Sequence, residues 1–230
     1  QGGQQALLKA LSETGKPMIV VLVSSKPLVL PMAYLKDAVI LTGFNPGMEG
    51  GNAIAEVLSG KLNPTGKLTI SFPVHVGQQP TFYNQVPGQH GDRYADLTQE
   101  PQFPFGHGLS YTSFEYSDFS LSAAEVVKGN SLQATVTVTN TGARAGTEIS
   151  QLYVNDLVTS ATWVEKRLIG FERIQLEAGE SKQVTFNIAT SDLWIVDAKA
   201  NYVVEAGEFC LRVGPSSRDE DHLTRNFLLK

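Results

Sequence analysis

Cysteine is almost absent from this sequence. Cys210 is the single cysteine among 230 residues, which excludes an intramolecular disulfide and a metal centre built from several thiolates. Polar and apolar residues alternate around it over Glu208–Val213, as they do in a β-strand. We therefore expect a buried structural thiol rather than a nucleophile, because a free cysteine usually behaves as a small hydrophobic residue.

Long apolar runs are also missing. The longest, Met18–Val23, is far shorter than the ~20 residues that a membrane-spanning helix needs. No signal-peptide pattern is present either. We expect no membrane partner. The chain begins at Gln1 inside a helical pattern, so the lack of a leader does not decide the localisation.

Basic clusters and metal-binding spacings are absent as well. The 18 Lys and Arg residues are outnumbered by 23 Asp and Glu residues, giving a net charge of −5, and we expect no nucleic-acid partner. The histidines, His75, His90, His107 and His222, show no i, i+4 pair. The sequence therefore predicts no metal site and no cofactor, and His107, between two glycines, is expected to be a packed loop residue.

Residues 1–72 have the alternation of helix and strand that is typical of an α/β layered domain. Helical patterns cover Gln4–Leu11 and Gly51–Leu58, and apolar strands cover Met18–Val23 and Ala38–Leu41. Every position of these strands is apolar, which indicates parallel strands buried on both faces. Two strands and two helices cannot cover such a sheet, so we expect the rest of it upstream of Gln1 or on another chain.

Two further regions follow. Residues 73–113 are rich in Pro, Gly and aromatic residues and lack periodicity, which predicts a long ordered connecting loop that is functional or packed on a domain face. Residues 114–230 contain alternating segments such as Leu132–Val138 and Val184–Ile188, separated by turns such as Glu177–Glu180. This pattern predicts an antiparallel β-sandwich of about 110 residues.

No active site is visible from spacing alone. The candidate acids are Glu49, Asp92, Asp96 and Glu100, and no spacing pairs two of them as glycosidic hydrolysis would require. Residues 47–51 (GMEGG) open a helix without the spacing of a dinucleotide or phosphate loop, so a tight turn with Glu49 near the helix dipole is the simpler interpretation. The two tryptophans, Trp163 and Trp194, lie in the predicted sandwich as packing residues or as a sugar-stacking platform.

Several motifs resemble those of family 3 glycoside hydrolases of the periplasmic β-glucosidase type. They are residues 43–58 (GFNPGMEGGNAIAEVL), 63–73 (NPTGKLTISFP), 104–114 (PFGHGLSYTSF), 138–142 (VTNTG) and 168–174 (LIGFERI). These motifs span nearly the whole chain in the family's order. The resemblance implies that residues 1–72 are the end of an α/β sandwich domain and that residues 114–230 are a fibronectin-III-like domain.

The resemblance also implies the chemistry. Such enzymes are retaining, exo-acting β-glucosidases, with an Asp nucleophile on a barrel and a Glu acid/base on a segment preceding the one similar to Met18–Pro27. We expect both outside this chain and assign no catalytic residue within it. His90, Arg93 and Tyr94 are the expected substrate-proximal residues. The implied partners are a β-glucoside or oligosaccharide and the missing N-terminal barrel portion.

Other readings stay open. Ser25-Lys26-Pro27 replaces the family's usual Gly-Arg-Pro, and Arg93-Tyr94-Ala95-Asp96 replaces Arg-Tyr-Phe-Asp, so sugar preference is undecided and a β-xylosidase is an alternative. A non-catalytic carbohydrate- or protein-interaction fragment is another. The resemblance favours a periplasmic or secreted location over a cytoplasmic one and leaves a homodimer of the full enzyme open.

Overall fold

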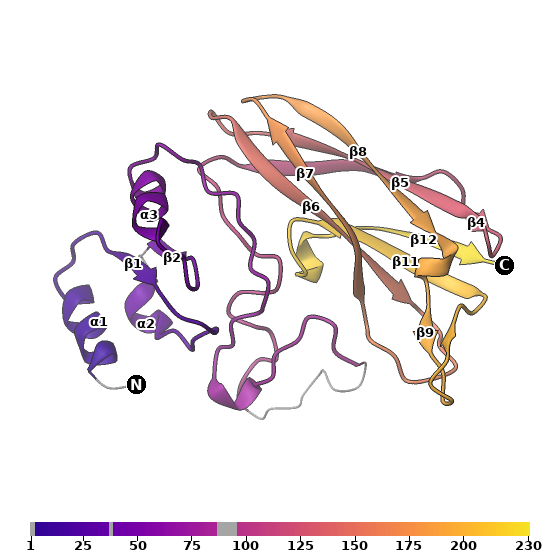
Figure 1. The fold of residues 1–230 in the computed structure, drawn as a ribbon, viewed down its shortest axis with the longest axis horizontal. Helices are drawn as coiled ribbons and strands as arrows, with labels where there is room; N and C mark the ends of the chain where they lie inside the picture. The colour runs from indigo at the N-terminus through magenta and orange to yellow at the C-terminus, as the bar shows by residue number, and fades with distance from the viewer. Residues whose placement is uncertain (1–2, 37–38, 87–95) are drawn as a thin grey trace. The chain divides into compact units, whose positions relative to one another are not determined.

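The computed structural model describes residues 3–36, 39–86 and 96–230. These form two compact units, each described here by itself (Figure 1). Unit 1 comprises Gln1–Leu62, Phe72–Thr81 and Glu100–Gln102, and unit 2 comprises Asn63–Ser71, Phe82–Gln99 and Phe103–Lys230. The chain therefore passes between the units more than once.

Unit 1 contains a small parallel sheet with short helices. Its elements are α1 (Gln4–Ser12), β1 (Ile19–Leu22), α2 (Met32–Leu35), β2 (Val39–Thr42), α3 (Gly50–Leu58) and the 3-10 turn η1 (Val76–Gln78). The parallel pairing of β1 with β2 confirms the α/β prediction. The helix α2 was not predicted, because four residues are too few to show a helical period. No helix in the described part of the chain is long and apolar enough to cross a membrane.

The strands of unit 1 are less buried than their composition predicts. Ile19 on β1 and Val39 on β2 are paired neighbours, and they are 53% and 57% exposed. In this unit by itself the two strands are therefore not buried on both faces, and their predicted burial, which depended on elements outside residues 1–72, stays a prediction. The physical reason is the one noted from the sequence, since two strands and three short helices supply too little surface to cover both faces of the sheet.

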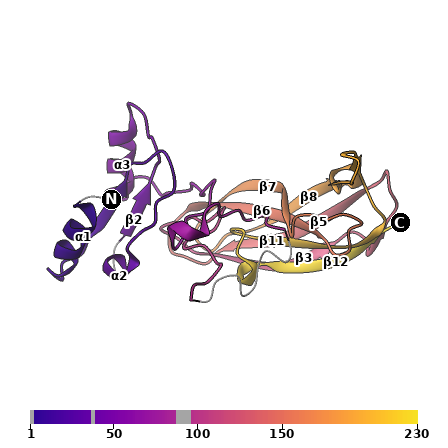
Figure 2. The same ribbon diagram turned by 90° about the horizontal axis from the view of Figure 1, so that it is seen from below.

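Unit 2 is a β-sandwich (Figure 1, Figure 2). One sheet has the order β4 (Glu125–Val126), β12 (Leu223–Leu229), β11 (Gly207–Gly214), β6 (Gly146–Asp156) and β7 (Arg167–Leu176). The other has the order β3 (Phe114–Leu121), β5 (Ser131–Asn140) and β8 (Ser181–Ala189). A hairpin of β9 (Ile195–Val196) and β10 (Tyr202–Val203), with the 3-10 turns η2 (Thr190–Asp192) and η3 (Asp219–Asp221), completes the described elements.

The core of unit 2 follows from strand alternation. On β5, every second residue from Leu132 to Val138 is at most 1% exposed, because side chains two apart point to the same face of a strand. These side chains pack with Leu152 and Val154 of β6 and with residues of β11 and β12 in one apolar cluster. Both sheets therefore close on a single core, which confirms the predicted sandwich.

Cys210 lies on β11 within this sandwich. It is a free thiol and is 7% exposed. Burial raises the pKa of the thiol above its ordinary value, which keeps it protonated and unreactive near neutral pH. The predicted structural role of the cysteine is confirmed.

Candidate functional site

The carboxyl ends of β1 and β2 meet at one edge of the sheet in unit 1. The parallel register pairs Leu22 with Thr42, so the turns that follow both strands begin side by side. The N–H of Ser24 donates to the carbonyl of Phe44 at 3.2 Å and joins the two turns. Ligands of open α/β sheets bind outside the carboxyl ends of the strands, so this edge is the candidate site surface of unit 1.

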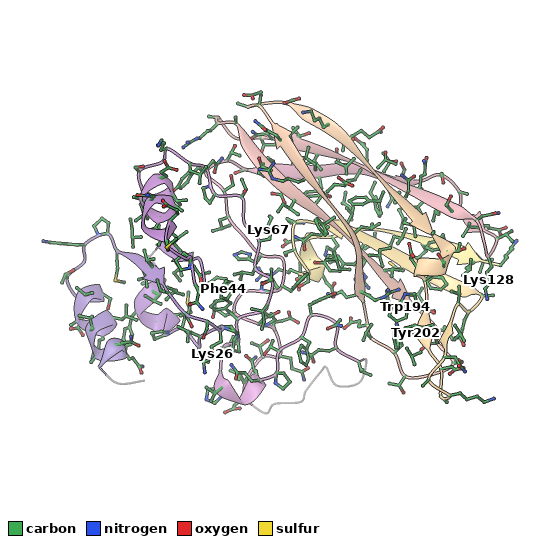
Figure 3. All side chains as sticks on the ribbon, viewed as in Figure 1. Lys26, Phe44, Lys67, Lys128, Trp194 and Tyr202 are labelled. Atoms are coloured by element: carbon green, nitrogen blue, oxygen red, sulfur yellow. The ribbon has the colours of Figure 1, made fainter. Side chains whose placement is uncertain are left out.

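Phe44 occupies a strained backbone position on this edge (Figure 3). Its φ is 52°, a left-handed value that is uncommon for a bulky residue. Its ring lies 6.3 Å from that of Phe72, which is 2% exposed. Close packing also fixes the start of α3, because a Cβ on Gly50 would lie 2.5 Å from Cβ of Pro46. The second turn is thus rigidly shaped by packing and by glycine.

The acidic candidate Glu49 is hydrogen-bonded within the first turn of α3. The side-chain amide of Asn52 donates to Oε2 of Glu49 at 2.7 Å. Glu49 stands at the N-terminal end of the helix, where the helix dipole favours a negative charge. This arrangement agrees with the expected tight turn and gives Glu49 a local structural role.

A second candidate surface lies on unit 2, where the long loop is fastened to the sandwich. The ring of Tyr83 stacks on Phe105 at 4.4 Å between centroids and meets Tyr153 edge-on at 5.7 Å. Its hydroxyl accepts a hydrogen bond from the N–H of Leu168 at 3.2 Å. The loop residues before position 87 are therefore anchored at the beginning of β7.

The substrate-proximal residues expected from the sequence lie beyond this anchor. The N–H of Glu165 donates to the carbonyl of Gln85 at 2.7 Å, which fixes the chain just before that stretch. His90, Arg93 and Tyr94 lie outside the described residues. Their nearness to a substrate stays a prediction.

Gln151 is the buried polar centre of the loop attachment. It lies on β6 and is 3% exposed. Its amide nitrogen donates to the carbonyls of Gly106 at 3.1 Å and Pro215 at 2.6 Å, and its Oε1 accepts from the Tyr153 hydroxyl at 2.6 Å. A Cβ on Gly106 would lie 2.1 Å from that oxygen. Only glycine fits there, so the loop and the strand are closely matched in shape.

A buried ion pair holds the segment 63–71 to the same strand. Nζ of Lys67 (Figure 3) lies 2.9 Å from Oε1 of Glu148, and the two side chains are 11% and 5% exposed. The hydroxyl of Tyr116 donates to the same carboxylate oxygen at 3.1 Å. Burial and the neighbouring Glu148 raise the pKa of Tyr116 well above its usual value. The phenol therefore stays a donor at any physiological pH.

Asn63 closes this attachment at its other end. Its amide nitrogen donates to the carbonyl of Ala145 at 3.0 Å, and its Oδ1 accepts from the Ser110 hydroxyl at 2.9 Å and the Tyr111 N–H at 2.8 Å. One side chain thus ties three segments together. We call the polar set of Asn63, Lys67, Glu148 and Gln151, of which Glu148 and Gln151 are buried, the polar clamp.

His107 is a packed loop residue, as expected. Its ring stacks on Phe103 at 5.3 Å between centroids, and its carbonyl accepts from the N–H of Leu68 at 2.8 Å. Burial, with the nearby positive charges of Arg218 and Lys67, lowers the pKa of its imidazole. The ring is therefore neutral near pH 7.

Two family models match this chain. Residues 1–111 match the glycosyl hydrolase family 3 C-terminal domain, and residues 148–217 match a fibronectin type III-like domain. The chain belongs to glycoside hydrolase family 3. It corresponds to a C-terminal part of these enzymes, which confirms the resemblance drawn from the motifs.

Curated relatives and solved structures agree with this family assignment. The chain is 41% identical over 93% of its length to the periplasmic β-glucosidase of Salmonella typhimurium, of which it covers 29%. It is 40% identical over its full length to a β-xylosidase of Formosa agariphila, of which it covers 32%. A β-glucosidase involved in saponin metabolism from intestinal bacteria superposes with a TM-score of 0.95 at 47% identity, over 99% of this chain and 33% of that one. The chain thus spans about a third of the length of its relatives.

Sequence reasoning missed the polar clamp. The available signal was the presence of Glu148 and Gln151 inside a segment expected to be a strand of the sandwich. Buried polar side chains need partners, and in this family member those partners are loop residues far away in the sequence.

Proposed function

We propose that this chain is the C-terminal portion of a retaining, exo-acting β-glucosidase, which hydrolyses terminal β-glucosyl residues. Relatives from Salmonella typhimurium and Acetivibrio thermocellus that match most of the chain are named β-glucosidases. So is the intestinal bacterial enzyme whose structure it resembles. These names support the activity of the larger enzyme.

The incomplete cover of unit 1 is the observation that carries the proposal. Ile19 and Val39 leave more than half of their surface exposed on two parallel strands. Parallel strands are normally covered on both faces, so these apolar side chains fit a sheet that continues in a larger enzyme. The chain is then a supporting part of a catalytic assembly.

The reaction indicates which groups the rest of the enzyme would supply and which role this chain would have. A retaining glycosidase needs two carboxyl groups about 5 to 5.5 Å apart, one as nucleophile and one as acid and then base. We place both outside this chain. The carboxyl edge of β1 and β2 would support the segment that carries the acid/base Glu, and the loop with His90, Arg93 and Tyr94 would line the substrate entrance.

The anchoring of that loop supports its proposed position. Tyr83 fixes the chain on one side, and Gln151 fixes the chain at Gly106 on the other. A loop that is held at both ends can present side chains at low entropic cost. The polar clamp would therefore act on activity indirectly, by positioning the loop.

A β-xylosidase is the second candidate. It is favoured by the Formosa agariphila relative, which matches the full length of the chain at 40% identity. The two candidates differ in the sugar that the complete site accepts. A non-catalytic interaction fragment is a third possibility, in which unit 2 would act alone.

A chimera tests these alternatives. The C-terminal 29% of the Salmonella typhimurium periplasmic β-glucosidase that matches this chain is replaced by residues 1–230, and hydrolysis of p-nitrophenyl β-glucoside and β-xyloside is measured. We expect the chimera to cleave the glucoside faster than the xyloside. We expect this chain alone and the truncated Salmonella portion alone to cleave neither.

Each other result has a definite meaning. Hydrolysis by residues 1–230 alone at the chimera's rate would place a catalytic pair inside this chain and overturn the proposal. A preference for the xyloside would establish the second candidate. A chimera that is folded by circular dichroism and cleaves neither substrate would contradict the supporting role and leave the interaction fragment.

A further inference from the structure

Three aromatic rings gather at one end of the sandwich in unit 2, away from the polar clamp. Trp163 lies between β6 and β7, Trp194 directly precedes β9, and Tyr202 begins β10. The ring centroids of Trp163 and Trp194 are 5.6 Å apart and those of Trp194 and Tyr202 are 4.8 Å apart, both edge-to-face. Figure 3 shows Trp194 and Tyr202 next to each other. We call these three rings the aromatic cluster.

The cluster is rigid and partly open. Tyr202 is 73% exposed, although its backbone is paired with Val196 in the hairpin. The guanidinium of Arg167 lies 4.1 Å from the ring centroid of Trp194, and it donates a hydrogen bond to the carbonyl of Asp192. Trp194 is thus held by three neighbours. A preformed aromatic surface of this kind binds a ligand with little loss of conformational entropy.

A small hollow adjoins two of these rings, those of Trp163 and Trp194. Asp156 and Arg167 also line it, among apolar side chains of the core. Its volume is about 10 Å³, which is close to the room that one water-sized group needs. The hollow therefore has room for one oxygen-sized group.

Two buried polar atoms of this lining have unused hydrogen-bonding capacity. Oδ2 of Asp156 and Nε of Arg167 have no partner among the described residues. The other carboxylate oxygen of Asp156 already accepts from the N–H of Val158 at 3.3 Å. One atom needs a donor and the other needs an acceptor, and a hydroxyl group is both. A buried polar atom without a partner is destabilising, so a group that pairs with both atoms is favoured here.

The charges around the cluster favour a neutral ligand. The carboxylates of Glu205 and Asp197 are held by Ser160 and Asn201, respectively, on the neighbouring loops. Together with Asp156, on which the charge of Glu205 acts, they place negative charge on this end of the sandwich. A polyanion would be repelled. The class of ligand that fits this surface is a neutral compound with hydroxyl groups and an apolar face that can lie on an aromatic ring.

We propose that the aromatic cluster is a non-catalytic saccharide-binding site of unit 2. One sugar hydroxyl occupies the hollow between Asp156 and Arg167, and the apolar face of a sugar ring lies on the exposed ring of Tyr202. This site goes beyond the proposed hydrolytic function, because it needs neither of the catalytic carboxylates. It would hold a neutral oligosaccharide chain on the surface of the protein.

Direct binding to residues 1–230 tests the site. Tryptophan fluorescence is titrated with cellohexaose, laminarihexaose and xylohexaose, since both Trp163 and Trp194 belong to the cluster. We expect at least one of these neutral oligosaccharides to bind with a saturable change in fluorescence. Tyr202→Ala should lower the affinity about two- to tenfold, which corresponds to the loss of about 0.5–1.5 kcal/mol for one aromatic stacking contact. Asp156→Asn should lower it as well.

Phe171→Ala is the matched control. Phe171 is an exposed aromatic residue of the same unit, 65% exposed on β7, and its replacement should leave the affinity unchanged. Equal weakening by the Phe171 and Tyr202 variants would overturn the assignment of the site. So would unchanged fluorescence with all three oligosaccharides, which would mean that the hollow holds only water. If Tyr202→Ala fails to fold, the Asp156 variant decides the question.

The result is separate from the hydrolysis test. Binding is measured on this chain without turnover, whereas the proposed function is measured on the chimera by product release. An inactive chimera would leave saccharide binding by unit 2 standing, and a cluster that binds nothing would leave the β-glucosidase proposal standing.

Discussion

Replacing Gln151 with Leu tests how strongly the polar clamp attaches the loop to unit 2. Leu has nearly the same volume, so the change removes hydrogen bonds without opening a large cavity. The Tyr153 hydroxyl, on a residue with 0% exposure, loses its acceptor, and the carbonyls of Gly106 and Pro215 lose a donor. Each unsatisfied buried group costs about 1–3 kcal/mol, so the three groups together should cost at least about 3 kcal/mol.

A double-mutant cycle separates the tyrosine contribution. Tyr153→Phe in the native background should cost about 1 kcal/mol, the ordinary net value of one hydrogen bond. In the Gln151→Leu background it should cost nothing or be stabilising, because the hydroxyl removed there has no acceptor. The cycle should therefore give a coupling energy of about 1–2 kcal/mol.

The assay is urea unfolding of the 230-residue chain followed by circular dichroism. Gln133→Leu is the matched control, since Gln133 is exposed on β5 and its side-chain amide donates to Oδ1 of Asn187 at the surface. Its replacement should change the stability by less than about 0.5 kcal/mol. Additive effects of the two mutations in the cycle, or a Gln151→Leu cost below about 1 kcal/mol, would refute the reasoning.

Two further predictions concern buried charge. Glu148→Leu should destabilise the chain by about 3–5 kcal/mol, because Lys67 is left as an unpaired buried cation, and adding Lys67→Met should recover much of that loss. Thermal unfolding of the single and double variants measures both effects. A double variant less stable than the single variant would contradict the prediction. Burial raises the pKa of Asp156 to about 6, so the folded state holds this proton more tightly than the unfolded state and stability falls as pH rises from about 4 to about 6. Asp156→Asn should therefore raise the melting temperature at pH 7 and leave it nearly unchanged at pH 4; an equal shift at both values would count against a titration of this group.

Strand alternation predicted the faces of the sandwich where only one face is covered. β5 shows the clean alternation of a strand with one face buried and one exposed. On β6 the pattern misleads, because Leu152 and Val154 join the core cluster whereas Ile149, three residues before Leu152, lies on the opposite face.

β6 lacks a regular alternation because both of its faces are covered. Residues 150–154 are all buried, since residues 63–71 and 103–111 attach to the outer side of this strand through the polar clamp. A strand covered on both sides loses its two-residue period. The covering residues are remote, with 81 positions between Lys67 and Glu148 and 45 between Gly106 and Gln151, so no local pattern could reveal them.

The sequence by itself determined the family, through the order of its motifs, and the class of each region, through local periodicity. It also identified Cys210 as a structural thiol. Only the tertiary structure decided that Lys67 meets Glu148, that Gln151 holds Gly106, and that Trp163, Trp194 and Tyr202 form one cluster. The physical reason is that periodicity reports which face a side chain takes on its own element, whereas the partner it meets there is chosen by the path of the whole chain.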